Sequence, residues 1–404
     1  MGRVNSIVHL ILFVTRLLAC FVALACLASV PTLADTLGTR APIALLSEPE
    51  SGTILFAKQA DKVFAPGSLA KVMTAATIFK ALQDGELTEG QLCRVSEHAW
   101  RTGGAPSRTS TMFASIKSEI SVADLLNGLL VQNANDAAII LAECLDGSED
   151  AFAKRMTDYA QTLGMRRSRF ANPTGFEVDK NAETKTGVAK STTTARDLAR
   201  LGTEILAQYP TYYDLFALPD FTWNKIYQRN KNSLLGEIRN LDGFGVGQSV
   251  GDGYVGLASV NRNGRRIVAV VAGLSSEKNR LTAMREVVEG AWDYFQTQTL
   301  YKGGVEIAEA RVFGGTSSRV PLKTISDVNV LLPLGGTLDY RLRVVYSGPL
   351  KAPVEAGKIV GELRVIGKDG ILYRSDLQTG ASVPRADMGG RALGSIQELL
   401  FGWF

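Results

Sequence analysis

Strand-like segments lie on both sides of a helical region in the first two thirds of the chain. Residues 41–46 and 52–57 are two short apolar runs, and residues 257–260 and 266–273 form a predicted hairpin around an Asn-Arg-Asn-Gly turn. Apolar residues recur at helical spacing between and after these strands. The helices expected from this spacing cover residues 151–163, 193–208 and 281–297. Strands that flank a helical middle predict one sheet covered by helices.

The pattern changes at about residue 300. Short apolar runs are separated there by Gly and Pro, and Arg341 and Arg343 alternate with Tyr340, Leu342 and Val344. The expected strands include residues 306–312, 328–332, 359–366 and 371–374. This pattern predicts a small all-β domain over residues 299–383.

Composition agrees with an ordinary globular protein of two or three domains. The chain has 404 residues, of which 46% are hydrophobic and 21% are charged. The formal net charge is +4, and Arg3 and Arg16 contribute two of these charges from the N-terminal segment. A balance this mild gives no argument for a nucleic-acid partner.

Residues 1–34 have the features of a secretory signal. Arg3 precedes apolar runs, and Pro-Thr-Leu-Ala at 31–34 is a suitable cleavage site. A membrane anchor is the alternative, but Arg16 interrupts the run and leaves residues 17–30 too short to span a bilayer. Residues 17–20 also faintly resemble a lipoprotein signal. We therefore expect export.

The C-terminal segment, residues 384–404, ends in a stretch that is apolar and aromatic with few charges. It is too short to cross a bilayer. A packed terminal helix is one interpretation. We favour an amphipathic helix in the membrane interface, which predicts peripheral contact with the inner membrane.

Two cysteines, Cys93 and Cys144, remain after the signal, because Cys20 and Cys26 lie within it. Both have apolar neighbours, so one disulfide and two buried thiols are both compatible with the sequence. Two cysteines make no metal site by themselves.

The segment most indicative of chemistry begins at Ser68. Pro66 and Gly67 break the preceding chain, and an apolar helical pattern follows, with Lys71 one turn after Ser68. A serine at a helix start benefits from the helix dipole, and a lysine within reach can act as its base if its pKa is lowered. The alternative is that Ser68 is an N-cap and Lys71 a surface charge.

The Ser-x-x-Lys pattern is weak alone, since Ser275 and Lys278 repeat it in a polar stretch that we interpret as a solvated loop. Histidine content strengthens the case for Ser68. His98 is the sole histidine after the signal, so a Ser-His-Asp triad would have to use it. Serine–lysine chemistry requires no histidine.

Polar residues also interrupt two apolar helical runs at 131–138. Ser121 and Asp124 form a capping box that opens the first run, and Asn133 and Asn135 lie just before the second. Polar groups between two buried helices line a cleft or satisfy backbone groups. We favour the interpretation in which these polar residues line a cleft.

Taken together, these motifs resemble the low-molecular-mass penicillin-binding proteins, the serine-type D-alanyl-D-alanine carboxypeptidases. The resemblance covers nearly the whole chain after the signal. The matching segments are Ser68 to Lys71 and residues 97–104, 129–138, 172–175 and 195–199.

The resemblance implies an α/β (α+β) transpeptidase-like domain over residues 35–298, with an antiparallel sheet flanked by helices, followed by the all-β domain and the tail. It also implies that Ser68 attacks the bond between two terminal D-alanines of peptidoglycan stem peptides, with Lys71 as base. β-Lactam antibiotics would acylate the same serine. No cofactor or metal is implied, and the expected location is the periplasmic face of the cytoplasmic membrane.

The chain departs from the family pattern at two motifs. The second motif, Ser-x-Asn, has Asn133 in place of serine and keeps Asn135. The third motif, Lys-Thr-Gly, is present literally at residues 185–187, but we interpret that copy as a coincidence in a polar stretch. The family context instead places Gly245 and Val246 where lysine and threonine belong.

Only Gly247 of this third motif remains, and Gln248 follows it. We expect Gly245, Gly247 and Gln248 to bind substrate. Arg229, which resembles the family's arginine near the site, is the fourth expected substrate-binding residue. The absence of the motif's lysine, with its positive charge, predicts a carboxypeptidase of reduced activity. A non-catalytic peptidoglycan-binding or cell-wall-organising homologue is the alternative, and a β-lactamase is disfavoured because no deacylating glutamate is identifiable.

Overall fold

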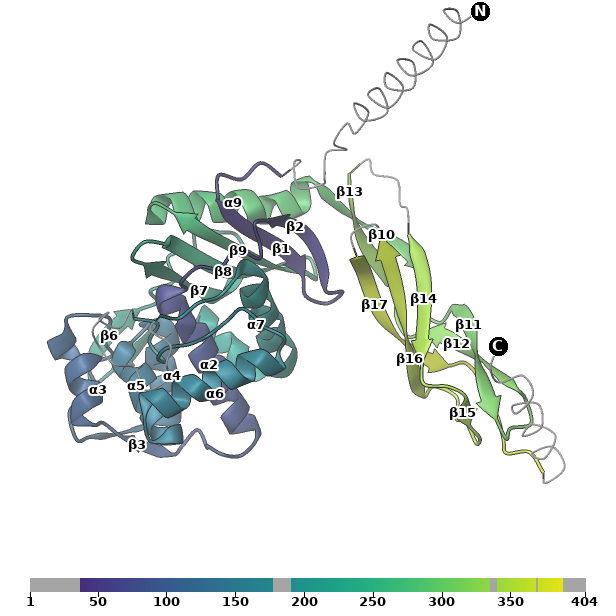
Figure 1. Cartoon of the computed structure of the whole chain (residues 1–404), viewed down its shortest axis with the longest axis horizontal. Helices are drawn as coiled ribbons and strands as arrows, with labels where there is room; N and C mark the ends of the chain where they lie inside the picture. The colour runs from purple at the N-terminus through teal and green to yellow at the C-terminus, as the bar shows by residue number, and fades with distance from the viewer. Residues whose placement is uncertain (1–36, 177–189, 335–339, 368–369, 388–404) are drawn as a thin grey trace, which may run out of the picture. The chain divides into compact units, whose positions relative to one another are not determined.

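The computed structural model describes residues 37–176, 190–334, 340–367 and 370–387 (Figure 1). These residues form a helical domain with a central sheet and a separate β domain. Among them, no helix combines the length and the apolar character needed to cross a membrane.

The first domain is built on a five-stranded antiparallel sheet with strand order β2-β1-β9-β8-β7. Its strands are β1 (Ile43–Glu48), β2 (Thr53–Lys58), β7 (Leu241–Ser249), β8 (Gly253–Arg262) and β9 (Arg265–Leu274). The predicted hairpin is confirmed, because Asn263 and Gly264 both adopt positive φ between β8 and β9. The N-terminal and C-terminal strands thus meet in one sheet, and β7 forms its edge.

Helices cover both faces of this sheet, which is why the inner strands are buried along most of their length. Figure 1 shows α9 on one face and the remaining helices on the other. The helices are α2 (Ala70–Gln83), α3 (Glu97–Thr102), α4 (Val122–Val131), α5 (Asn135–Asp146), α6 (Glu149–Thr162), α7 (Ala195–Gln208), α8 (Pro210–Tyr213) and α9 (Glu277–Asp293).

Short elements connect these helices. They are the 3₁₀ turns η2 (Gly67–Leu69), η3 (Ala105–Ser107) and η4 (Asp214–Ala217), and the strand pairs β3 (Leu92–Arg94) with β4 (Glu119–Ser121) and β5 (Asp220–Trp223) with β6 (Ile226–Arg229). The expected capping box is present, since the Ser121 hydroxyl accepts a hydrogen bond from the Asp124 N–H at the start of α4.

Two sequence-based expectations near α9 are wrong. The helix was expected over 281–297, but it begins at Glu277 and ends at Asp293. The Ser276 side chain accepts a hydrogen bond from the Asn279 N–H and caps the helix. The second Ser-x-x-Lys copy is therefore a helix start and not a loop, with Ser275 and Lys278 exposed to solvent.

The second domain is all-β. Its larger sheet has the order β14-β16-β17-β12-β11-β15, and a smaller sheet pairs β10 with β13. The strands are β10 (Phe295–Tyr301), β11 (Glu306–Phe313), β12 (Arg319–Thr324), β13 (Val328–Pro333), β14 (Arg341–Tyr346), β15 (Leu350–Lys351), β16 (Ile359–Gly367) and β17 (Gly370–Thr379). The first strand begins at Phe295, four residues before the expected boundary at 299. A core of aliphatic side chains, including Val320, Leu363 and Leu377, lies within this domain.

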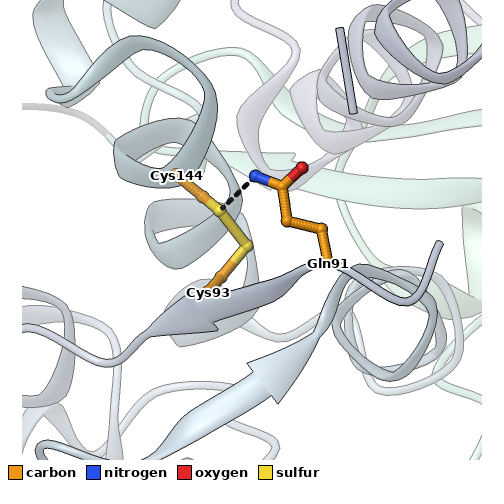
Figure 2. Close-up of a disulfide and its surroundings, with 3 residues drawn as sticks. All are labelled: Gln91, Cys93 and Cys144. Atoms are coloured by element: carbon orange, nitrogen blue, oxygen red, sulfur yellow. Dashed lines mark hydrogen bonds between the residues drawn. A yellow bond between two sulfur atoms is a disulfide. The ribbon is translucent and has the colours of Figure 1, made fainter. Parts of the chain in front are cut away.

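Cys93 and Cys144 form a disulfide, which the sequence left open. Figure 2 shows the bond between β3 and the C-terminal part of α5, with the Gln91 side-chain amide donating a hydrogen bond to the Cys144 sulfur at 3.8 Å. The bond fixes the last turns of α5, the helix that begins at Asn135.

Candidate active site

Ser68 lies in the 3₁₀ turn η2, directly before the buried helix α2. Neither Ser68 nor Leu69 caps this helix with a side-chain hydrogen bond, so the N-cap interpretation of Ser68 is wrong. Gly67 has φ +53°, and a Cβ at this position would lie 2.0 Å from the Gln248 carbonyl oxygen. Only glycine allows the turn to approach β7 this closely. The serine is therefore held against the edge strand of the sheet.

One pocket contains both residues of the Ser-x-x-Lys motif. Its walls come from η2 and α2, from α4 and the connection that follows it, from η4, from the segment after β6, and from β7. The lining residues are Ser68, Leu69, Lys71, Val72, Leu129, Leu130, Asn133, Phe216, Lys231, Asn232, Phe244, Gly245 and Val246.

Lys71 is buried, with 3% of its surface exposed, although lysine is almost never buried without a function or a partner. Burial lowers the pKa of its ammonium group to about 7, and the negative charge of Asp136 opposes part of this shift. A large fraction of Lys71 is consequently neutral at neutral pH. Such an amine can accept a proton from a neighbouring hydroxyl.

The Asn-Pro-Thr-Gly segment at 172–175 orients Lys71. The Lys71 ammonium donates a hydrogen bond of 2.9 Å to the Thr174 carbonyl. The Asn172 side-chain oxygen accepts hydrogen bonds from the N–H groups of Thr174 and Gly175, which closes the segment into a tight turn. The sequence resemblance includes this segment and gives no role for it. The Asn-Pro pair in the sequence indicates a turn. It does not indicate that the Thr174 carbonyl contacts Lys71.

Asn133 lies between α4 and α5 and lines the pocket, as expected. Its φ is +54°, in the left-handed region that Asn tolerates better than most residues. Asn135, the first residue of α5, is buried outside the pocket wall: its side-chain amide donates to the Thr109 hydroxyl at 2.9 Å. Its side-chain oxygen is also buried and has no partner among the described residues. Asn133 is thus among the pocket-lining residues, and Asn135 is a buried residue that is not among them.

Asp136 is a buried residue that sequence analysis missed. Its carboxylate accepts hydrogen bonds from the Thr111 hydroxyl at 2.5 Å and from the Met112 and Ala114 N–H groups at 3.0 and 3.1 Å. Burial raises the pKa of this carboxyl, and these hydrogen bonds act in the opposite direction. Asp136 therefore anchors the loop before β4 to the start of α5. An acidic residue inside an apolar helical run was the signal that could have revealed it.

The packing of β7 at the pocket explains why the chain keeps Gly247 of the third motif. A Cβ at Gly247 would lie 2.4 Å from the Pro66 carbonyl oxygen, so glycine is required there. A Cβ at Gly245 would make only ordinary contacts, at 3.6 Å from Leu69 Cδ1 and 3.8 Å from Val72 Cγ2. Gly245 thus leaves space in the pocket wall that a side chain would fill. Gln248 is exposed, and its main chain lies against Gly67.

The structure places a different basic residue at the pocket from the one expected. Arg229 ends β6, is exposed, and is absent from the pocket lining. Lys231, two residues later, lines the pocket together with Asn232. Residues 185–187, the literal Lys-Thr-Gly copy, lie outside the described residues.

Comparison with known proteins identifies both domains. Residues 31–276 match the family model described as D-alanyl-D-alanine carboxypeptidase, and residues 295–385 match that of the penicillin-binding protein 5 C-terminal domain. The chain is 31% identical over 352 residues to the D-alanyl-D-alanine carboxypeptidase DacA of Haemophilus influenzae, covering 86% of each protein. It is 31% identical over 322 residues to DacC of Escherichia coli, covering 79% of this chain and 78% of the relative.

Solved structures agree with these matches. Penicillin-binding protein 5 from Haemophilus influenzae superposes with a TM-score of 0.70 at 30% identity, covering 86% of this chain and 98% of the other. Penicillin-binding protein D2 from Listeria monocytogenes, solved in its cefotaxime-bound form, superposes with a TM-score of 0.52 at 27% identity and covers 63% of this chain and 98% of its own.

Proposed function

The chain belongs to the D-alanyl-D-alanine carboxypeptidase family of serine hydrolases, and we propose that it removes the terminal D-alanine from peptidoglycan stem peptides through an acyl-enzyme on Ser68. The observation that carries this proposal is a buried Lys71 with a pKa of about 7 in the same pocket as Ser68. A lysine with an ordinary pKa would be protonated at neutral pH and unable to serve as a base.

In the first step the neutral Lys71 amine accepts the proton of the Ser68 hydroxyl, and the serine oxygen attacks the carbonyl between the two D-alanines. The Thr174 carbonyl, 2.9 Å from the amine, holds its nitrogen in place. The tetrahedral intermediate then collapses: its C–N bond breaks, the leaving D-alanine amine takes up the proton that Lys71 had accepted, and the acyl group remains on Ser68. Water hydrolyses this ester and restores the serine.

Two backbone N–H groups are suited to hold the negative charge on the oxygen of the intermediate. One belongs to Ser68 and the other to Gln248, whose main chain lies against Gly67. This contact requires the absence of a Cβ at Gly67 and at Gly247. The two glycines are therefore part of the proposed oxyanion site.

Asn133 is expected to slow the reaction. An amide forms hydrogen bonds but does not relay a proton as a hydroxyl does. Protonation of the leaving amine is the step that this change affects. The non-catalytic alternative is not favoured, because the named relatives are carboxypeptidases and both Ser68 and Lys71 lie at the pocket.

We also propose that β-lactams acylate Ser68, because the Listeria relative was solved with cefotaxime and with ampicillin bound. We further propose that residues 1–34 direct export and that residues 384–404 contact the membrane peripherally. Residues 1–34 and 388–404 lie outside the described residues, so these two parts depend on the sequence pattern.

The test of the proposed function is the intact mass of the protein after incubation with excess benzylpenicillin. Wild type is expected to gain the mass of one penicilloyl group, and Ser68→Ala is expected to gain none while keeping its melting temperature. An adduct that persists in Ser68→Ala would refute the assignment of the nucleophile. No adduct in wild type would refute the serine–lysine mechanism.

A further inference from the structure

The second domain carries a row of arginines that the proposed reaction does not use. β14 pairs with β16, and β16 pairs with β17, so these three strands are neighbours in the larger sheet (Figure 1). The register places Arg343 opposite Arg364, and Arg364 opposite Arg374. Directly opposite residues of antiparallel strands project from the same face of a sheet. The three arginines therefore form one row across the three strands.

This row lies on the outer face of the sheet. Successive side chains of a strand alternate between its two faces. The alternate residues on the other face, including Leu363 on β16 and Tyr373 on β17, are buried in the core of the domain. Arg343 and Arg374 are exposed, and the Arg364 side chain is 31% exposed. The row is therefore accessible to a large ligand.

The row carries more positive charge than its neighbours neutralise. Arg364 forms an ion pair with Glu362. Arg343 and Arg374 form no ion pair with any residue in the described parts of the chain. Like charges that lie directly opposite each other destabilise a sheet. A bound anion would relieve the repulsion within the row.

The adjacent row on the same face limits which anions fit. Glu362 lies opposite Asp376, two residues along β16 from Arg364. A planar array of negative charges, such as a bilayer of anionic lipids, would meet this acidic pair together with the arginines and be repelled by it. A single chain that carries carboxylates can follow the arginine row alone. Because neighbouring strands are about 4.8 Å apart, such a chain would pass the three arginines within about 10 Å.

We propose that this arginine row binds peptidoglycan through the carboxylates of its stem peptides, so that the second domain holds the polymer on which the first domain acts. The inference rests on the proposed function for its choice of polymer. Stem peptides that end in D-alanine carry a free carboxylate before and after the reaction, and the polymer presents many of them. Guanidinium groups bind carboxylates through paired, charge-assisted hydrogen bonds. Contacts at two sites on one polymer raise the overall affinity above that of either site.

Binding of the Ser68→Ala protein to insoluble peptidoglycan tests the inference without turnover. The protein is mixed with purified peptidoglycan, the polymer is pelleted, and the apparent dissociation constant is obtained from the protein that remains in solution. Adding Arg343→Gln with Arg374→Gln should weaken binding about 10-fold or more. Arg343→Lys with Arg374→Lys keeps the charge and should bind more tightly than the glutamine variant.

Lys351→Gln with Lys358→Gln is the matched control, because it removes two exposed positive charges of the same domain that lie outside the row. This control should bind as tightly as the Ser68→Ala parent. Peptidoglycan whose carboxylates have been converted to amides is the matched ligand. On the amidated polymer, the parent and the double glutamine variant of the row should bind equally.

Three results with peptidoglycan would overturn the inference. They are unchanged binding in the double glutamine variant of the row, an equal loss of binding in the lysine control, and a difference between parent and variant that persists on the amidated polymer. Pelleting with phosphatidylglycerol vesicles provides a fourth. If the row variant loses binding to vesicles and keeps binding to peptidoglycan, the row is a lipid-binding site and the inference is wrong.

Melting temperatures separate a role in binding from a role in folding. Because the substitutions remove like-charge repulsion, the double glutamine variant should melt at the temperature of its parent or above it. A lower melting temperature would show that the row stabilises the fold, which contradicts the repulsion argued above. The single variant Arg374→Gln then replaces the double variant and is judged by the same binding criteria.

Failure of the inference and failure of the proposed function are distinguishable. A wild type that benzylpenicillin does not acylate refutes the proposed mechanism, yet binding that depends on the arginine row in Ser68→Ala would still support the inference. Acylation of wild type, with no effect of the arginine substitutions on binding, refutes the inference alone.

Discussion

At the scale of single residues, the proposed mechanism depends on the burial of Lys71, which lowers the pKa of its ammonium group. Lys71 loses the solvation of its charged form, and the carbonyl of Thr174 offers its ammonium only one hydrogen bond. The nearby Asp136 limits the fall in pKa, because its negative charge favours the protonated lysine. The balance leaves the pKa of Lys71 close to physiological pH.

This balance predicts the pH dependence of acylation. Below a pH of about 7, Lys71 is protonated and cannot accept the Ser68 proton, so the rate should rise with pH and level off above that value. The measurement is the second-order rate constant for benzylpenicillin acylation between about pH 5.5 and pH 8.5. Lys71→Met should lower the rate by about 100-fold or more at every pH. A flat profile in wild type would contradict the role of Lys71.

At the scale of elements, β7 determines what remains of the third motif. Its edge position lets η2 pack directly on its main chain, and this contact requires glycine at 247 but not at 245. Gly245 and Val246, at the positions expected for the motif's lysine and threonine, are therefore compatible with an intact strand. What the strand lacks there is the ammonium and hydroxyl groups of those two side chains.

A double variant tests this view of β7. Gly245→Lys with Val246→Thr places side chains where the wall has space, and we expect acylation by benzylpenicillin to become about 10-fold faster. Gly247→Ala is the contrasting variant: its Cβ would lie 2.4 Å from the Pro66 carbonyl oxygen, so acylation should be lost. A double variant that folds but is no faster than wild type would mean that the missing groups do not limit the reaction.

The disulfide belongs to the same scale, because it connects β3 to α5. Its two cysteines are 51 residues apart, and cross-linking a loop of this length stabilises a protein by about 2–4 kcal/mol. Cys93→Ala with Cys144→Ala should lower the free energy of unfolding by about this amount. Denaturant titration measures it. Because the bond lies near the far end of α5 from Asn135, acylation of the folded variant should change by less than about two-fold.

At the scale of the whole molecule, the chain combines a serine–lysine domain with an all-β domain and two terminal segments. The two family models match the two described domains in turn, over residues 31–276 and 295–385. The roles that we propose for residues 1–34 and 384–404, export and peripheral membrane contact, concern where the protein is located.

Deletion of residues 392–404 tests the role of the C-terminal end. We expect the shortened protein to appear in the soluble fraction after cell lysis, since the apolar and aromatic residues of this segment would provide the membrane affinity. Its acylation by benzylpenicillin should equal that of the full chain. A shortened protein that stays with the membrane fraction would show that another part of the chain makes the contact.

The sequence by itself determined the features that depend on local pattern. Helical spacing after Ser68, the Asn-Gly turn at 263–264 and the Ser121 capping box each follow from a few neighbouring residues, and all three are present in the structure. The all-β domain was predicted for the same reason. Gly247 was recognised through its motif, although only the contact with Pro66 explains why it must be glycine.

Tertiary structure alone decided the features that depend on distant segments. The pKa of Lys71 results from burial in the folded domain, where the distant Thr174 carbonyl contacts its amine. The pairing of Cys93 with Cys144 results from the meeting of β3 and α5. The choice of Lys231 over Arg229 was decided in the same way. Both are basic and two residues apart, and the main chain at Lys231 is hydrogen-bonded to the end of α4, which places Lys231 and not Arg229 among the pocket-lining residues.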